Sequence, residues 1–525
     1  MRAGTWLLAL GCWAALGGCG GERGTLKVKI KTPPGADDPF LQAVQVRMTV
    51  GERTAVAPVM AGRFSVQIEV DEPDREQPVR LVLEALDAGG QVVGRGRTPS
   101  FVLLPQNSEI TVYVGRPGRV TPTEVQLLDA EQRPAGRADL AGASLRGRGT
   151  ERALGALVVG GVNAAGHSEP SAWLYDPMTH ALVAAGRPQK ARRGAVLVPS
   201  ADGDVGQQAI LWGGALVAGG AELELPTAAE VFDPAMPSLA TVFSSPAPEV
   251  AEAGPPGAVG ATVAEVQPGL FVASGGRQRK AQPAQPDQPI NQAVLLQRVA
   301  APEGAADRRA RPGVQRLGGG AGGPMVAARY GHTATPVSLP EGPGLLLFGG
   351  LGDGVQEPAA EEFSLSQRQF RAVPLFVTQG DRQVPVPSRR GHVAAPLRDG
   401  RVLVLGGVEA GQSRPQDSGL LIEVRSRQVQ PLPGWLAVAR QGAAVSVVGD
   451  EIAVCGGLGP EGQVLASCEF FAVESGQRSR PPVPMPTARA GHVQLALETD
   501  QVLLVGGFGE GGQLPAAIDL LTPLR

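Results

Sequence analysis

The sequence predicts an all-β protein, and three observations carry that prediction. Apolar runs that end in Gly-Gly recur along the C-terminal three quarters of the chain. The N-terminal quarter consists of short segments in which apolar and polar residues alternate between Gly, Pro and Asp turns. Gly (73 residues) and Pro (47 residues) are abundant but lie between apolar runs, as in proteins with many turns. At 525 residues, the chain is long enough for several domains or one large repeat array.

The first residues resemble a bacterial lipoprotein signal peptide, which would occupy residues 1–18. Arg2 supplies a positive charge, and Thr5–Leu16 is an apolar stretch too short to remain as a membrane-spanning helix. Leu16-Gly17-Gly18-Cys19 follows directly and is similar to a lipobox. The resemblance implies cleavage before Cys19 and acylation of its thiol and new amino terminus, with residues 19–23 as a lipidated tether. The alternative is an ordinary secretory signal that contains an incidental cysteine.

A lipidated Cys19 predicts a cell-envelope location. Several acyl chains on one residue exceed what reversible membrane binding requires, so the chain would be stably anchored to the membrane. Gly20 and Gly21 follow the cysteine and no Asp does, which favours the outer membrane over retention in the inner membrane. The sequence leaves the periplasmic face and the cell surface open.

Residues 24–118 predict a small β-sandwich of the immunoglobulin or transthyretin type. Ala88-Gly89-Gly90 is expected to form a hairpin turn inside one of its segments. A spacer that lifts the rest of the chain off the membrane is the simplest role for this unit. The alternating segments are Thr25–Ile30, Ala43–Val50, Arg63–Val70, Val79–Thr98 and Ser108–Gly115.

Internal repeats organise residues 119–525. Each copy contains an apolar run that ends in a glycine pair, because glycine allows backbone angles that stop a strand. The steps from Gly407 to Gly457 and from Gly457 to Gly507 give a period near ~50 residues. The pairs are Gly160-Gly161, Gly213-Gly214, Gly275-Gly276, Gly349-Gly350, Gly406-Gly407, Gly456-Gly457 and Gly506-Gly507.

Two further motifs accompany the glycine pairs. Arg-x-Gly-His precedes the apolar run at Arg329–His332, Arg389–His392 and Arg489–His492. Arg192–Ala195 and Arg440–Ala443 keep the Arg and Gly but lack the His. A third predicted strand follows the glycines. It is found at Trp173–Pro177, Glu230–Pro234, Glu362–Ser364, Glu469–Phe471 and Asp519–Pro523.

Together these residues resemble the kelch family, in which each repeat forms one four-stranded blade of a β-propeller. Seven glycine pairs predict seven blades, or six if the third copy is not counted, because it has Pro255-Pro256-Gly257 in place of the arginine motif. The last copy ends after its third strand, so Glu124–Leu128 is expected to complete it and Asp139–Leu145 to begin the first blade. Pro-, Gln- and Ala-rich insertions near 277–289 and 302–324 predict mobile loops.

Two of the four cysteines lie outside the leader, at the ends of neighbouring predicted strands. Cys455 ends the second strand of the sixth copy, and Cys468 begins its third. Outside the cytoplasm such a pair is expected to oxidise. A metal or redox role would need partners that the sequence does not show, so we expect a structural Cys455–Cys468 disulfide.

Three histidines occupy equivalent positions in copies four, five and seven: His332, His392 and His492. A metal needs donors that converge to ~2 Å, whereas equivalent positions of a propeller are spread around its axis. We therefore expect these histidines to pack and hydrogen-bond within each blade. No metal, cofactor or catalytic residue is assigned.

The repeated arginines are the candidate ligand-binding residues. In kelch proteins this position lies at the entrance to the innermost strand, where the central channel opens, and in some members it binds acidic partners. The resemblance implies a set of guanidinium groups around one mouth of the channel, able to grip carboxylates. The alternative is that each arginine pairs with an acidic residue or loop carbonyls of a neighbouring blade. The candidates are Arg193 (or Arg192), Arg329, Arg389 (or Arg390), Arg440 and Arg489.

Several function classes lack the residues that they need. A net charge of -3 without a Lys/Arg block argues against nucleic-acid binding. A copper radical oxidase resembling galactose oxidase needs Tyr and His ligands and a Cys joined to a Tyr, but the repeats hold only Tyr175 and Tyr330 and their cysteines are expected to pair. Sialidase-like Ser-x-Asp-x-Gly boxes are missing.

We therefore predict a lipid-anchored envelope protein whose propeller is a non-catalytic binding module for a protein or glycan, with an acidic ligand favoured by the arginines. The alternative is a periplasmic kelch-type epimerase or mutarotase that acts on an acidic sugar. Such an enzyme needs only an acid/base residue and arginines around the channel, although no Glu or Asp stands out for that role. The sequence names neither the ligand nor the oligomeric state.

Overall fold

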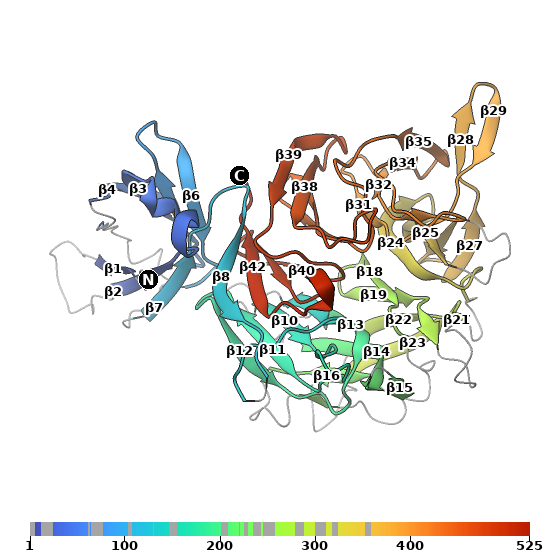
Figure 1. Cartoon of the computed structure of the whole chain (residues 1–525), viewed down its shortest axis with the longest axis horizontal. Helices are drawn as coiled ribbons and strands as arrows, with labels where there is room; N and C mark the ends of the chain where they lie inside the picture. The colour runs from blue at the N-terminus through green and yellow to red at the C-terminus, as the bar shows by residue number, and fades with distance from the viewer. Residues whose placement is uncertain are drawn as a thin grey trace.

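The computed structural model of the chain is all-β, with many antiparallel sheets (Figure 1). Its helical segments within the described residues are short 3-10 turns: η1 (Gly35–Asp37), η2 (Pro39–Leu41) and η4 (Glu510–Gly512). None of the described helices has the length and apolar character needed to cross a membrane. The structure describes residues 6–11, 25–60, 64, 77–102, 108–129, 131–145, 155–200, 208–219, 221–224, 229–234, 243–244, 258–278, 288–299, 311–317, 324–351 and 359–524.

Two sheets at the N-terminal end enclose one apolar core. Alternating side chains of both sheets, among them Val28, Met48, Leu83 and Val112, are fully buried in it. Strand β2 pairs with β1 in antiparallel and with β7 in parallel orientation. One sheet contains β1 (Trp6–Gly11), β2 (Thr25–Lys31) and β7 (Ser108–Tyr113), and the other contains β4 (Arg53–Pro58), β3 (Gln45–Val50), β5 (Leu81–Leu86) and β6 (Val92–Arg97).

Most of the predicted N-terminal segments coincide with strands, with three differences. Strand β1 was not predicted and lies within the predicted signal peptide, so cleavage before Cys19 would remove it from the sheet. Strand β4 was not predicted either, although it completes a hairpin with β3. The predicted segment Arg63–Val70 lies outside the described residues except for Phe64, which stacks on Phe40. Cys19 and most of the predicted signal peptide also lie outside the described residues. The predicted turn is present between β5 and β6, where Gly90 has a φ of 77°.

Seven antiparallel sheets follow in chain order, and each has one of the glycine pairs within or directly after its second strand. They are numbered here as sheets one to seven. Sheet one has β9 (Ala141–Leu145), β10 (Gly155–Val159), β11 (Ala172–Asp176) and β12 (Ala181–Gly186); sheet two has β13 (Arg193–Ser200), β14 (Gln208–Ala218), β16 (Glu230–Phe232) and β17 (Phe243–Ser244), with β15 (Ala221–Glu224) beside β14; sheet three has β18 (Thr262–Gln267), β19 (Leu270–Ser274), β22 (Ala293–Val299) and β23 (Arg311–Leu317).

The remaining four sheets repeat this order. Sheet four has β24 (Tyr330–Leu339), β25 (Gly342–Leu351), β26 (Ala360–Ser364) and β27 (Gln369–Val373); sheet five has β31 (Val393–Pro396), β32 (Val402–Leu405), β34 (Gly419–Glu423) and β35 (Gln428–Leu432); sheet six has β36 (Ala444–Val448), β37 (Glu451–Cys455), β38 (Ser467–Ala472) and β39 (Arg478–Pro484); sheet seven has β40 (Val493–Ala496), β41 (Val502–Val505), β42 (Ala517–Leu521) and β8 (Val120–Gln126).

The last sheet joins the two ends of the repeat region. Strand β8, which precedes the first sheet in sequence, pairs with β42 from Val120–Leu521 to Gln126–Ala517. The sequence predicted this closing strand at Glu124–Leu128, and the structure begins it four residues earlier. First strands of successive sheets also lie side by side, from β9 and β13 through β36 and β40, and β40 in turn lies beside β9.

The weak third copy forms a complete four-stranded sheet like those of the other copies. Its arginine motif was aligned at Pro255-Pro256-Gly257, which lies outside the described residues, but Ala258-Val259-Gly260 takes the motif's place: the N–H of Gly214 donates to the carbonyl of Ala258 at 2.9 Å. The expected loop at 302–324 is also corrected. Residues Arg311–Leu317 pair with Ala293–Val299 as the outer strand β23, where a proline is tolerated.

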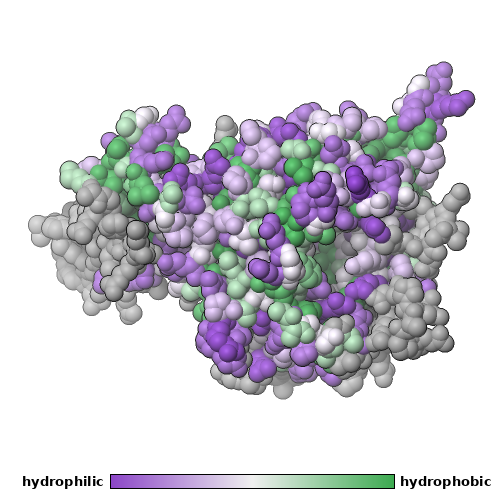
Figure 2. All heavy atoms as spheres, in the orientation of Figure 1, coloured by the Kyte–Doolittle hydropathy of each residue, from purple (hydrophilic) through white to green (hydrophobic). Residues whose placement is uncertain are grey.

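Short additional strands lie beside the seven sheets. The expected loop at 277–289 begins and ends as a short ladder of β20 (Arg277–Gln278) and β21 (Gln288–Pro289), and residues 279–287 lie outside the described residues. A hairpin of β28 (Phe376–Gln379) and β29 (Arg382–Pro385) projects from the outer edge of sheet five, next to β35 (Figure 1). Hydrophilic residues cover its tip (Figure 2).

The second and third strands of sheet six are joined by a Cys455–Cys468 disulfide. The two residues lie directly opposite each other in the ladder, and both side chains are fully buried. Their separation of 13 residues closes a short loop. The bridge therefore reinforces a pairing that the ladder already makes.

Replacing both cysteines by alanine is expected to lower the free energy of unfolding by roughly 3 kcal/mol, because the unfolded chain regains the entropy of a short loop. Urea unfolding of the double variant and of the parent, both under non-reducing conditions, measures this difference. Equal unfolding midpoints for the double variant and the parent would contradict this role for the disulfide. So would a parent whose stability does not fall when reductant is added, if the double variant is less stable.

Candidate functional site

The repeated arginines lie inside the sheets. Arg329, Arg440 and Arg489 are at most 2% exposed, and Arg389 is 5% exposed. A ligand at the surface of the protein cannot reach the guanidinium groups of Arg329, Arg440 and Arg489, which are buried and paired. The expectation that the repeated arginines encircle an opening as ligand-binding groups is therefore wrong for these three, and their geometry matches the alternative of internal pairing. Arg389 is also buried, but it adjoins a small cavity. Arg193 differs, because 21% of its side chain is exposed while its neighbour Arg192 is buried.

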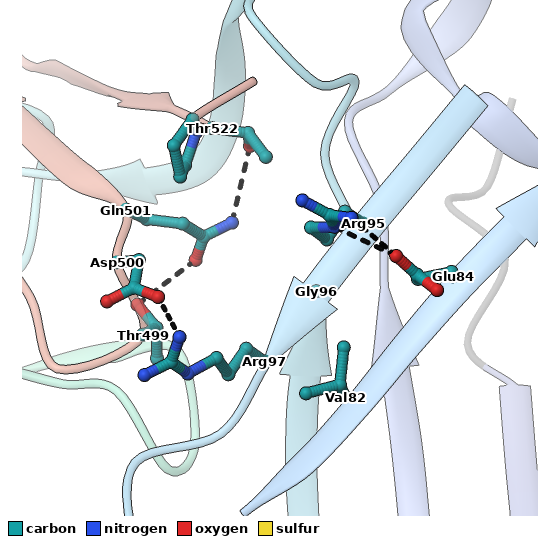
Figure 3. Close-up of a pocket in the computed structure, with 10 residues that line it drawn as sticks. Val82, Glu84, Arg95, Gly96, Arg97, Thr499, Asp500, Gln501 and Thr522 are labelled. Carbon is teal, nitrogen blue, oxygen red and sulfur yellow. Dashed lines mark hydrogen bonds and ion pairs between the residues drawn. The ribbon is translucent and has the colours of Figure 1, made fainter. Parts of the chain in front are cut away.

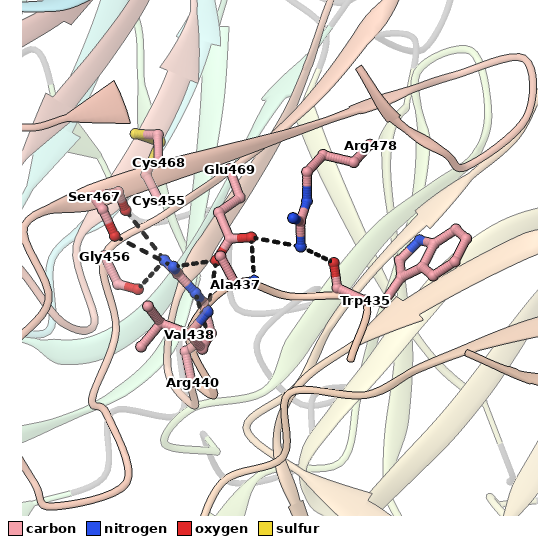
Figure 4. Close-up of polar contacts among 10 residues, drawn as sticks. All are labelled: Trp435, Ala437, Val438, Arg440, Cys455, Gly456, Ser467, Cys468, Glu469 and Arg478. Carbon is pink, nitrogen blue, oxygen red and sulfur yellow. Dashed lines mark hydrogen bonds and ion pairs between the residues drawn. A yellow bond between two sulfur atoms is a disulfide. The ribbon is translucent and has the colours of Figure 1, made fainter. Parts of the chain in front are cut away.

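Sheet six shows the internal pairing in full (Figure 4). Arg440 Nη2 lies 2.6 Å from Glu469 Oε1, and Arg440 Nη1 donates to the carbonyls of Gly456 and Ser467. The Glu469 carboxylate also accepts the backbone N–H of Ala437 at 2.7 Å. One arginine thus connects the second strand, the third strand and the loop that enters the first strand.

The same pair recurs in sheets two, four and seven. The distances are 2.9 Å from Arg192 Nη2 to Glu230, 2.8 Å from Arg329 Nε to Glu361 and 3.0 Å from Arg489 Nη2 to Asp519. Burial lowers the pKa of Arg440 and Arg489 and raises that of Asp519, and the opposite charge beside each group counteracts these shifts. Each pair is therefore a desolvated ion pair that holds its sheet together.

The glycine pairs join each sheet to the next. The N–H of Gly457 in sheet six donates to the carbonyl of Arg489 in sheet seven at 2.7 Å, and the N–H of Gly507 donates to the carbonyl of Arg137 in sheet one at 2.9 Å. A Cβ at Gly456 would lie 2.1 Å from the Arg489 carbonyl oxygen, so a side chain does not fit there. The contact between Gly507 and Arg137 identifies Arg137 as the arginine of the first copy, which the sequence motif did not reveal.

Side chains that directly follow a repeated arginine, or in sheets three and seven a glycine pair, form what we call the rim. In Arg-x-Gly, the middle residue of one sheet lies against the motif glycine of the preceding sheet: a Cβ at Gly331 would lie 3.8 Å from Cβ of Arg390, and a Cβ at Gly391 would lie 3.6 Å from Cβ of Gln441. These side chains are partly exposed. The rim consists of Arg193, Arg277, Tyr330, Arg390, Gln441 and Phe508.

Charges on the rim are unevenly paired. Arg193 forms ion pairs with Asp139 and Glu222, and Arg277 lies 3.8 Å from Glu222 and over the ring of Tyr330. Arg390 makes no ion pair or side-chain hydrogen bond among the residues that the structure describes. Sequence reasoning included Arg193 and Arg390 among its candidates but did not separate them from the buried arginines beside them, because adjacent arginines look alike in the sequence.

The three repeat histidines pack between sheets rather than within them. His332 Nε2 lies 3.2 Å from Ser274 Oγ of sheet three, and His392 Nε2 lies 2.8 Å from Thr333 Oγ1 of sheet four. Neither ring nitrogen of His492 has a hydrogen-bond partner among the described residues. The prediction that each histidine bonds within its own blade is thus wrong for His332 and His392, because both reach the preceding sheet.

His180, which carried no signal in the sequence, connects the N-terminal sheets to sheet one. Its Nε2 accepts the N–H of Tyr113 at 3.1 Å, its Nδ1 lies 2.7 Å from Tyr175 Oη, and its carbonyl accepts from Lys31 Nζ at 2.8 Å. Because Nε2 accepts a hydrogen bond, the ring is neutral. Protonation would break this contact.

A cavity of about 160 Å³ lies at a second contact of the N-terminal sheets, this time with sheet seven (Figure 3). Arg97 forms an ion pair with Asp500 across it, while Arg95 pairs with Glu84. Burial raises the pKa of Glu84, and hydrogen bonds from Arg95 and Arg47 more than reverse this effect, so the carboxylate stays ionised. The charges that line this cavity are matched within the protein, which makes it a junction between the two parts.

Among the described residues, no group of three or more His, Cys, Asp or Glu side chains is arranged to hold a metal ion.

Replacing Arg440 by Ala is expected to lower the free energy of unfolding by roughly 3–5 kcal/mol, because Glu469 would remain buried without its counter-charge. Chemical denaturation measures the loss. Arg398→Ala is the matched control, since Arg398 pairs with Asp450 and Glu474 on the surface and its loss should change stability little. Similar effects of both substitutions would contradict the structural role of Arg440.

Acid is expected to destabilise the protein through its buried histidines. Burial lowers the pKa of His180, His332, His392 and His492 to about 3. Between pH 6.5 and pH 3 the unfolded chain binds protons that the folded protein excludes, so the free energy of unfolding decreases as the pH falls through this range. Each histidine contributes up to about 1.4 kcal/mol per pH unit.

Urea unfolding at several pH values tests this dependence in His392→Gln and, as a control, in His167→Gln, whose side chain is exposed. The first variant should show a shallower loss of stability on acidification, and the second should follow the parent. Parallel curves for the parent and His392→Gln would exclude a neutral buried His392.

Comparison with known proteins finds no match: no protein-family model matches the chain, and no curated protein does.

Proposed function

We propose that this chain is a lipid-anchored cell-envelope protein whose seven sheets are the blades of a kelch-type β-propeller, and that the propeller is a non-catalytic binding module for a protein or glycan. An N-terminal β-sandwich spaces the propeller from the membrane. Support for the propeller comes from the serial four-stranded sheets, from the contact between β40 and β9, and from the pairing of β8 with β42.

The observation that carries the binding function is the division between repeated and non-repeated side chains at the inner end of the sheets. The repeated arginines of sheets two, four, six and seven form buried ion pairs, which explains their recurrence by stability alone. The rim side chains differ from sheet to sheet and remain partly exposed, as Tyr330, Arg390 and Gln441 illustrate. Such a surface can recognise a partner without altering the scaffold that holds it.

An acidic ligand fits the rim best. Arg390 is unpaired among the described residues, and its guanidinium group offers a planar set of donors that matches a carboxylate. Tyr330 lies on the neighbouring sheet and presents an aromatic surface of the kind that binds sugars and peptides. Acidic glycans and acidic protein segments both satisfy this combination of a cation and an aromatic ring.

The envelope location rests on the lipobox resemblance at Cys19, which implies an acylated amino terminus. An outer-membrane anchor would present the rim to molecules of the periplasm or the cell surface. Metabolic labelling with a palmitate analogue, compared between the parent and Cys19→Ser, tests the anchor directly.

Arg390→Glu is expected to weaken binding of acidic glycans or acidic envelope proteins at least tenfold, because it replaces an unpaired cation by an anion at the rim. The ligand is first found by screening the soluble protein against uronic- and sialic-acid glycans and against envelope extracts. Affinity is then measured for the variant by surface plasmon resonance.

Arg382→Glu serves as the matched control, since it makes the same charge change at the exposed tip of the β28–β29 hairpin, away from the rim. Binding should survive there. An equal loss of affinity in both variants would show that the effect comes from the change in net charge. Unchanged affinity in Arg390→Glu would show that the rim does not bind the ligand. Conversion of a bound sugar would instead support the epimerase alternative.

A further inference from the structure

One of the seven sheets, sheet five, departs from the pattern of the others. In each sheet, the residue two positions before the glycine pair lies opposite a residue of the third strand. In sheets two, four, six and seven, that opposite residue carries the carboxylate of the buried arginine pair. Sheet three replaces both charges together, with Ala258 and Val294. Sheet one keeps Arg137, whose guanidinium lies 5.8 Å from the centre of the Trp173 ring that replaces the carboxylate.

Among the seven sheets, only sheet five keeps the arginine but has an aliphatic residue at the position of the carboxylate. Val404 pairs with Leu420 where the other sheets have Glu or Asp. The loop entering the first strand has changed as well: Pro387 occupies the position of Val438, whose N–H binds the carboxylate in sheet six, and proline has no N–H. Sheet five has therefore lost the carboxylate together with a backbone donor that would hold it.

Arg389 remains incompletely paired. Its Nη1 donates to the carbonyl of Ser418 at 3.1 Å and more weakly to that of Gly406 at 3.4 Å, and its Nη2 donates to Ser418 Oγ at 3.0 Å. The nearest carboxylate in the described residues is that of Glu409, at 3.9 Å from Nη2. Nε is buried and has no hydrogen-bond partner among the described residues.

A cavity of about 60 Å³ adjoins this guanidinium group. Arg389 and Arg390 contribute two positive charges to its lining, and Glu409 contributes one negative charge, so the balance is positive. The rest of the lining combines polar groups, such as those of Ser388 and Gln412, with the apolar side chains of Val408 and Ala410. The volume suits one small group of a few atoms and excludes a whole sugar or an aromatic ring.

We propose that this cavity binds a small monovalent anion, either a carboxylate group or chloride, which supplies at Arg389 the negative charge that Leu420 does not. Burial of a cation without a full counter-charge is costly, and an anion that fits beside it recovers part of that cost. This site shares Arg390 with the rim, but it differs from the proposed recognition of a large partner because it is centred on Arg389 and needs only one ionised group.

Leu420→Glu provides the decisive variant, because it restores the internal carboxylate found in four other sheets. Anion binding to the full-length soluble protein is measured by saturation transfer to the methyl group of acetate and by line broadening of ³⁵Cl⁻, each at constant ionic strength. We expect both signals in the parent and at least a tenfold loss of affinity in Leu420→Glu, whose own glutamate occupies Arg389.

Each outcome decides the proposal. Mutual displacement of acetate and chloride in the parent would support a general anion site, and acetate signals without chloride broadening would support it with a carboxylate ligand. Absence of both signals in the parent, or equal signals in the parent and Leu420→Glu, would overturn it.

Two further variants serve as controls for folding and for the location of the anion site. If Leu420→Glu does not fold, Arg389→Met, which removes the charge and keeps a long side chain, must lose the same signals. Arg193→Gln, at the rim of sheet two, must retain them. Because Leu420→Glu leaves the rim intact, binding of a large partner should persist in it, so failure of the anion site and failure of the proposed function are distinguishable.

Discussion

One hydrogen-bonded node, repeated from sheet to sheet, holds the C-terminal region together. Its centre is the arginine: the backbone carbonyl of Arg489 receives the N–H of Gly457 from the preceding sheet, while Nη1 of the same residue donates to the carbonyl of Gly506 in its own sheet. A buried carboxylate then fixes the guanidinium plane. Because the carbonyl comes from the backbone, the junction survives where the side chain is lost, as Ala258 shows in the third sheet.

The closing sheet couples this series to the N-terminal part. Strand β8 continues directly from that part and forms the outer strand of sheet seven, so the chain reaches the last sheet before it builds the first. Further contacts fix the same junction, through the neutral ring of His180 and through the ion pair of Arg97 with Asp500. The N-terminal part is therefore held against sheets one and seven by these side-chain contacts as well as by the continuous chain.

The sequence predicted the strands better than it predicted the candidate site. Glycine pairs and apolar runs located the repeated sheets, because strand-ending glycines and buried strands leave periodic signals. The same reasoning misread Arg311–Leu317 as a loop, since Pro312 and Gly313 are tolerated on an outer strand that has only one neighbour. Arg137 was missed because Asp139, with a φ of 52°, stands where the other copies have glycine.

The site could not be predicted, because a repeated charge in the sequence does not reveal whether it faces solvent or a partner. Arg329 and Arg390 look alike in the sequence, yet one is buried against Glu361 and the other is partly exposed without a partner among the described residues. The node explains this difference. The junction needs only a backbone carbonyl at the arginine position and the N–H of the glycine pair in the preceding sheet, whereas the residue after the arginine contributes a side chain that lies over the preceding motif glycine. Side chains at that middle position can therefore differ from sheet to sheet without loss of a junction, and recognition of a partner can differ with them.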